Sequence, residues 1–120
     1  MIKLVMCLRR KEGMSRKEFN DYWQNSHAPL FMDNAQIMGA KRYVQSQTLD
    51  SEMNQAFKES RDMEDEYDGI AEVWFDSEGA LFEAMGTPEA QELSGKLLKD
   101  EQNFIDHTKS SAFLVKEIEF

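Results

Sequence analysis

Four short apolar segments constrain the fold of this chain more than any other feature of its sequence. Residues 2–8 are rich in Ile, Leu and Val, and charged residues end the run before it reaches helical length, so it predicts a buried strand. Segments 40–48, 67–75 and 112–118 are predicted strands as well. The chain has 120 residues, of which 41% are apolar, and this suffices for one domain with a hydrophobic core.

The first connecting segment carries the signals of a helix. Ser15 followed by Glu18 is a capping box. Three apolar residues and a histidine then recur at steps of three and four on one helical face: Phe19, Trp23, His27 and Leu30. Pro29 disfavours helical geometry at the residue before it, so the regular helix should loosen or end near Ala28.

Two further helices are predicted after the third strand. Asp76 or Ser77 caps the first of them, which ends at Gly86. Thr87 and Pro88 suit the cap and the first position of the second, which runs to about residue 100.

The order of these elements, with two strand–helix–strand units, predicts a single α+β domain over residues 1–120. Its architecture is a ferredoxin-like β-α-β-β-α-β sandwich. Helices cover only one face of such a sheet, yet the strands at 2–8, 67–75 and 112–118 look apolar on both faces. We expect a second copy of the chain to cover the other face. The sequence therefore predicts a homodimer in which two sheets face each other as a dimeric α/β barrel.

An acidic excursion at about residues 50–67 interrupts this pattern. Between Asp50 and Asp68, eight acidic residues stand against two basic ones, which is a net charge of −6 out of the −9 of the whole chain. We interpret this segment as a solvated insertion with one or two weak amphipathic turns, rather than as a binding element.

The charge and the apolar pattern exclude several classes of partner. A net charge of −9 argues against nucleic-acid binding and against a basic helix on a membrane surface. No apolar run approaches the length of a membrane span, and the first eight residues are too short for a secretory signal. The single Cys7 is expected to be a buried, inert thiol, with a reactive nucleophile as the alternative. We expect a cytoplasmic protein.

His27 is the most informative candidate for chemistry. It lies on the apolar helix face behind Phe19 and Trp23, directly before the disruption at Pro29. A histidine that is partly shielded from water at this position is suited to transferring a proton near neutral pH. The alternative is a histidine of the core or helix end that only hydrogen-bonds a carbonyl.

Acidic residues supply possible partners for this histidine. Glu72 and Asp68 share one face of an otherwise apolar strand, where a carboxylate has either a raised pKa or a partner. For both acids, the alternative is a salt bridge across the sheet to Arg9, Arg42 or Lys116. Asp106, next to His107, is a second candidate acid or orienting carboxylate, and its alternative is an exposed turn.

The sequence favours no metal or cofactor. His27, Glu72, Asp106 and His107 lack the local His-His or Cys-Cys spacing of a strong metal site. The glycines are scattered and form no phosphate-binding loop. We therefore predict no cofactor and no metal.

Several motifs together resemble the EthD family over nearly the whole chain. The opening similarity lies in residues 8–15, which are followed by Glu18-Phe19, Tyr22-Trp23 and His27-Ala28-Pro29-Leu30. The middle similarity is the acidic, aromatic strand at 67–76. The closing similarity consists of Thr87-Pro88-Glu89, Asp100-Glu101, Asn103-Phe104-Ile105-Asp106 and Phe113-Leu114-Val115. The acidic excursion departs from the family's shorter connection at that place.

The resemblance implies the dimeric α/β barrel and an apolar pocket with one or two side chains that transfer protons. Related barrels include dehydratases, cyclases, muconolactone isomerases and cofactor-free monooxygenases. Carried over to this chain, the predicted catalytic residues are His27, with Glu72 and Asp106 as its partners. The predicted contacts to a substrate are Trp23, Tyr43, Trp74 and Phe104.

Three functional hypotheses follow. The preferred one is cofactor-independent proton transfer on a small apolar or aromatic carbonyl compound, by dehydration, isomerisation or cyclisation, with His27 as the general base. The second is a non-catalytic dimeric accessory protein that binds an apolar metabolite for a partner enzyme. The third is a cofactor-free monooxygenase or a haem-related barrel.

Overall fold

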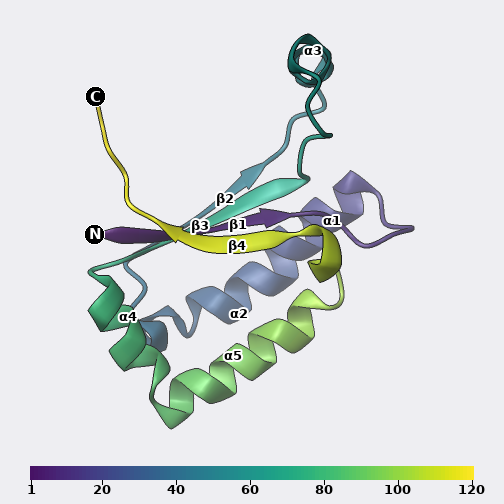
Figure 1. Cartoon of the computed structure of the whole chain (residues 1–120). Coiled ribbons are helices and arrows are strands. Elements are labelled where there is room, and N and C mark those ends of the chain that lie inside the picture. The colour runs from purple at the N-terminus through teal and green to yellow at the C-terminus, as the bar shows by residue number, and fades with distance from the viewer.

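The sheet confirms the predicted ferredoxin-like α+β fold. The computed structural model describes all 120 residues. Its four strands are β1 (Ile2–Leu8), β2 (Arg42–Gln47), β3 (Gly69–Phe75) and β4 (Ser111–Val115). They form one antiparallel sheet in the order β2-β3-β1-β4 (Figure 1). The fourth strand ends three residues before the predicted boundary.

The first helical segment contains a break at the predicted place. α1 (Arg16–Tyr22) begins with the complete capping box of Ser15 and Glu18. A π-helical turn, Trp23–His27, follows it and leads directly into α2 (Ala28–Met32). In this turn the N–H of Ala28 donates to the carbonyl oxygen of Trp23, five residues back. Pro29 explains the change, because it lacks an N–H and its ring clashes with the carbonyl four residues back.

The second helical segment follows the predicted boundaries. Ser77 caps α4 (Glu78–Met85), and Thr87 caps α5 (Pro88–Glu101). Two short 3₁₀ helices, Ala35–Met38 and His107–Lys109, complete the connections. Apart from α3, the helices lie on one side of the sheet (Figure 1). No helix is long and apolar enough to cross a membrane.

The core lies between these helices and the inner face of the sheet. Trp23, Phe19, Phe104 and Leu8 are its largest fully buried side chains. A second cluster of six buried residues joins α2, β3 and α5. Apolar side chains at helical spacing in α1 and at alternate positions in β1 and β3 therefore meet in one layer.

The other face of the sheet carries no helix. Glu72 lies in the middle of it, opposite Val5 and Val44, and Lys3 binds Glu72 at 2.6 Å. Phe113 on β4 is opposite Val5 and is half exposed. The face therefore combines apolar side chains with a central ion pair, whose cation is Lys3 and not one of the three basic residues named as alternatives from the sequence. Cys7 is half-buried on this same face, because it alternates with the inward Met6 and Leu8, whereas the sequence predicts a buried thiol.

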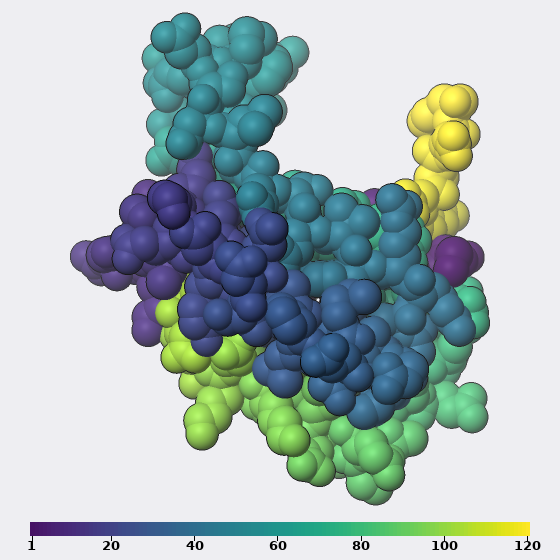
Figure 2. All heavy atoms as spheres, turned by 180° about the vertical axis from the view of Figure 1, so that it is seen from behind, coloured from purple at the N-terminus to yellow at the C-terminus, as the bar shows by residue number.

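The acidic excursion forms a projecting arm. It contains α3 (Glu52–Arg61), a helix of ten residues without a single buried side chain, which exceeds the predicted one or two turns. The arm stands away from the body of the domain, as does the tail after β4 (Figures 1 and 2).

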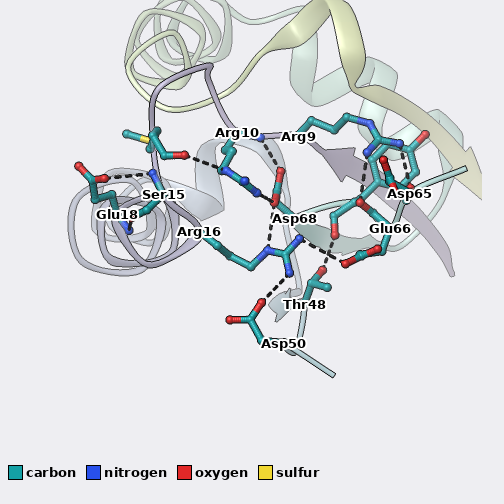
Figure 3. Close-up of polar contacts among 12 residues, drawn as sticks. Arg9, Arg10, Ser15, Arg16, Glu18, Thr48, Asp50, Asp65, Glu66 and Asp68 are labelled. Atoms are coloured by element: carbon teal, nitrogen blue, oxygen red, sulfur yellow. Dashed lines mark hydrogen bonds and ion pairs between the residues drawn. The ribbon is translucent and has the colours of Figure 1, made fainter. Parts of the chain in front are cut away.

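Asp68 ties the end of the arm to the domain (Figure 3). Its side chain is 7% exposed, and it accepts hydrogen bonds from the Arg10 backbone N–H at 2.8 Å and from Arg16 Nε at 3.1 Å. The Arg10 guanidinium also donates to it. Arg16 reaches Asp50 at 2.9 Å, and the Arg9 guanidinium donates to the carbonyl oxygens of Asp65 and Glu66. Asp68 is therefore structural, and it does not share an environment with Glu72.

Candidate functional site

A cavity of about 190 Å³ lies between the inner face of the sheet and the helices. Most of its wall is apolar and comes from β1, β3 and α5, with Trp23 and Phe31 from the first helical segment. An apolar cavity of about 150 Å³ in another protein holds benzene, so this one is large enough for a substituted aromatic ring. The polar side chains that line it are His27, Tyr43, Ser94 and Glu101.

His27 is held at the cavity wall by a carboxylate. Its Nδ1 lies 2.7 Å from Oδ2 of Asp100 on α5, and its side chain is 10% exposed. The Phe104 ring packs against the imidazole, with centroids 5.1 Å apart. Nε2 has no hydrogen-bond partner in the protein. When Nδ1–H donates its hydrogen bond to Asp100, the neutral ring presents Nε2 as a base.

Asp100 stays ionised because several groups hydrogen-bond its carboxylate. Partial burial raises its pKa, but hydrogen bonds from Tyr22 and His27, together with the attraction of a charged His27, outweigh that effect and leave the pKa below its usual value. The Tyr22 hydroxyl donates to Oδ1 at 2.6 Å. The same bond raises the pKa of Tyr22 and keeps its hydroxyl protonated. An anionic Asp100 stabilises His27 after the ring has taken up a second proton.

Tyr43 is another polar residue of the cavity wall. Gln45 donates one hydrogen bond to the Tyr43 hydroxyl at 2.7 Å and another to the carbonyl of Trp23 at 3.0 Å. Burial raises the pKa of Tyr43, so the phenol remains neutral. Gln45 therefore couples β2 to the π-helical turn that ends at His27.

Two polar groups from α5 complete the site. Ser94 and Glu101 both line the cavity, and Leu97 lies between them at helical spacing. The Ser94 Oγ is buried and has no hydrogen-bond partner in the protein, which leaves it free to bind a polar atom of a ligand. No cluster of three or more histidines, cysteines or acids is close enough to hold a metal ion.

The comparison with family models decides the family. The EthD domain model matches residues 11–108, which is most of the chain. This chain belongs to the EthD family. No curated protein matches it in sequence.

Solved structures agree with the EthD assignment at the level of the fold. An EthD family protein from Bacillus halodurans is 22% identical, with a TM-score of 0.65 over 98% of this chain and 99% of that chain. A dimeric protein with a ferredoxin-like fold from Bacteroides fragilis is 9% identical, with a TM-score of 0.59 over 97% and 95%. SnoaB, a cofactor-independent oxygenase from Streptomyces nogalater, is 13% identical, with a TM-score of 0.55 over 99% and 94%.

The structure of this EthD protein brings some of the predicted site residues together and separates others. His27, Trp23 and Tyr43 line the cavity. Phe104 is fully buried behind His27 and packs against it without lining the cavity.

The two predicted partner acids do not reach His27. Glu72 lies on the uncovered face of the sheet, where Lys3 binds it. Trp74 lies on the same face and stacks under the Arg42 guanidinium at 4.5 Å. Asp106 is at the surface, where it caps the 3₁₀ helix by accepting from the backbone N–H of Thr108. Strand alternation separates Glu72 and Trp74 from the cavity, and the capping role holds Asp106 outside it.

The residue that sequence reasoning missed is Asp100. The charged run Lys99-Asp100-Glu101 suggests a solvated helix end. The signal against that interpretation is spacing: Ala90, Leu93 and Leu97 are buried at steps of three and four, and the next steps fall on Asp100 and Glu101. An acid at such a position lies on the buried face of the helix and needs a partner.

Proposed function

We propose that this protein is a cofactor-independent enzyme that moves a proton on a small apolar or aromatic carbonyl compound. The observation that carries the proposal is the His27–Asp100 pair at 2.7 Å on the wall of an apolar cavity. A histidine whose Nδ1 is held by an acid and whose Nε2 is free has the arrangement of a general base. Dehydration, isomerisation and cyclisation all begin with such a step.

In the proposed reaction, His27 Nε2 removes a hydrogen from the carbon next to the carbonyl group. The electron pair moves towards the carbonyl oxygen, and Ser94 is the unpartnered hydroxyl that would bind this oxygen. Asp100 stabilises the charge that appears on the imidazole. The aromatic and aliphatic wall excludes water and selects a substrate that is itself apolar.

We propose in addition that the working form is a homodimer paired through the uncovered face of the sheet. The half-exposed Phe113, with Val5 beside it, supplies an apolar surface on that face. The Lys3–Glu72 ion pair would be enclosed in the interface with its charges already paired.

The test uses benzylacetone, a methyl ketone that carries a phenyl ring and no leaving group, in heavy water. We expect the protein to catalyse the replacement of hydrogen by deuterium next to the carbonyl group, as measured by proton NMR. His27→Ala should lower the rate by roughly 10²–10⁴-fold. His27→Gln is the more conservative variant and should show the same loss, while circular dichroism checks that both variants remain folded. An unchanged rate in both folded variants would contradict the role of His27.

The binding hypothesis predicts a different result in the same experiment. A non-catalytic binder would take up benzylacetone and shift the ring signals of His27, yet it would exchange no hydrogen above the buffer rate. That outcome would replace the enzymatic proposal with the accessory role.

The fold likeness to SnoaB, a cofactor-independent oxygenase, makes oxygenation a second candidate. Proton removal by His27 would also be its first step, because a carbanion is the species that reacts with oxygen. An oxygen electrode separates the two candidates, since proton transfer alone consumes no oxygen.

A further inference from the structure

Glu101 is an ionisable residue of the cavity wall that the general base does not use. It follows Ser94 and Leu97 on the inner face of α5, and all three line the cavity with His27. Its side chain is 16% exposed. Its neighbour Asp100 bonds His27, so the two consecutive acids at the end of α5 have different partners.

The partner of Glu101 is the other histidine of the chain. His107 Nε2 lies 3.0 Å from Glu101 Oε1, and the His107 side chain is 39% exposed. His107 belongs to the 3₁₀ helix that Asp106 caps, and it borders a surface depression that is separate from the cavity. Ile105 lines both spaces. Glu101 therefore bonds a group in contact with solvent while it contributes to the wall of the cavity.

We propose that Glu101 is the general acid of this site, that His107 supplies its proton from solvent, and that the substrate is a carbonyl compound with a hydroxyl on its β-carbon. This inference rests on the proposed function and deepens it, because it selects dehydration among the reactions that begin with proton abstraction. Dehydration needs an acid because hydroxide is a poor leaving group. Isomerisation by one base needs no second group that takes up protons from solvent.

The step balances as the loss of one water molecule. His27 Nε2 takes the hydrogen from the carbon next to the carbonyl group, and the electron pair of that bond moves first towards the carbonyl oxygen and then returns to form the new carbon–carbon double bond. The bond from the β-carbon to oxygen breaks, and the leaving oxygen takes the proton of Glu101 and departs as water. His27 is then protonated and Glu101 is ionised. His107 donates the next proton to Glu101 and regains one from solvent, while His27 releases its own.

The groups around Glu101 fit this cycle. His107 is its hydrogen-bond partner, and His27 and Tyr43 are the other titratable groups on the cavity wall. Ionised Glu101 contributes to the raised pKa of Tyr43, after the larger effect of burial, and this keeps the phenol neutral. Asp100 is adjacent in sequence and is occupied by Tyr22 and His27. No lysine or arginine lines the cavity, so a proton bound at Glu101 faces no competing cation there.

The test compares two ketones that differ by one hydroxyl group. Benzylacetone undergoes hydrogen exchange only, whereas the analogue with a hydroxyl on the carbon next to the ring can lose water to give benzylideneacetone, which absorbs in the near ultraviolet. We expect Glu101→Gln to lower dehydration by roughly 10²-fold or more, and to lower the exchange of benzylacetone far less, because exchange has no leaving group to protonate. His27→Gln should lose both activities.

The proton supply has its own readout. We expect His107→Gln to dehydrate more slowly at low buffer concentration, and we expect added imidazole to restore the rate, because a small base can occupy the exposed position of His107. Imidazole should not restore Glu101→Gln, because imidazole replaces the side chain of His107 and not the carboxyl group of Glu101. Thr108→Ala, which changes the same 3₁₀ helix without removing the histidine, is the matched control and should resemble the wild type.

The results test the general base, the general acid and the proton supply separately. Exchange that depends on His27, together with dehydration that is absent from the wild type or unchanged in Glu101→Gln, would overturn the general acid and leave the general base in place. A His107→Gln variant with wild-type dehydration at low buffer, or with a loss that imidazole does not repair, would overturn the proton supply. A wild type that catalyses neither reaction would overturn the proposed function and this inference with it.

Discussion

Substituting Gly69 by alanine tests how tightly the wall of the cavity is packed. Gly69 is the first residue of β3 and lies against the indole of Trp23. A Cβ atom at this position would be 2.5 Å from Cζ3 and 2.8 Å from Cη2 of Trp23, and 3.2 Å from the carbonyl oxygen of Ser46. Carbon atoms pack best at about 3.5–4.0 Å, so the ring would have to retreat by about 1 Å.

Neighbouring side chains restrict that movement of Trp23. Its side chain is 1% exposed, and the Phe19 ring packs against it with centroids 5.4 Å apart. Overpacking a core by one methyl group typically costs about 1–3 kcal/mol. For a domain of this size, we expect Gly69→Ala to lower the Tm by roughly 3–12 °C. Because Trp23 also lines the cavity, the affinity for benzylacetone should fall with it.

Gly95→Ala is the matched control, because it adds the same methyl group elsewhere. Gly95 lies inside α5 and is exposed, and nothing would lie within 4 Å of its Cβ. Alanine is better than glycine in a helix interior by about 1 kcal/mol, so this variant should be stabilised. Urea unfolding followed by circular dichroism measures both changes. A Gly69→Ala protein as stable as the wild type would refute the reasoning about the Trp23 contact.

Three further predictions concern charge and assembly. Asp68→Asn should lower the free energy of unfolding, measured by urea titration, by about 2–3 kcal/mol. This is less than the loss for a fully buried ion pair, because the side chain of Arg10 is 37% exposed. Asp62→Asn in the exposed arm is the control and should leave the free energy of unfolding unchanged. The folded-state pKa of Asp100 lies below its ordinary value of 3.8, so the ionised carboxylate stabilises the fold above that value, and this stabilisation is lost as the pH falls through the folded pKa. Asp100→Asn should therefore lose less stability on acidification than the wild type. Equal acid sensitivity of the two proteins would contradict this. Phe113→Glu should give a monomer in gel filtration with light scattering, whereas the control Phe82→Glu on α4 should keep the mass of the dimer. A wild-type monomer at micromolar concentration would contradict the proposed dimer.

The elements of the fold were predictable because their signals are local. The capping box at Ser15, the cap at Thr87 and the disturbance before Pro29 each depend on neighbours within one turn, and all three are present in the structure. The inward face of α1 was also predictable, because 3.6 residues per turn bring Phe19 and Trp23 to one side.

The candidate site was predictable only at His27 and at the cavity walls Trp23 and Tyr43. Periodicity placed Glu72 correctly beside Ile70 and Trp74 on one strand face, but the strand pattern does not say which face the helices cover. Both faces of β3 carry large apolar residues, so the alternation contains no signal that separates them.

Local patterns in the sequence account for the order of strands and helices, their caps, and a histidine on a buried helical face. Only the packing of distant elements shows that the acid beside this histidine is Asp100, and that Glu101 lines the cavity while it bonds His107. The difference arises from the separation of the interacting residues along the chain. A cap or an apolar stripe depends on residues a few positions apart, whereas His27 and Asp100 are 73 residues apart and meet only because α5 packs against the helix that carries His27.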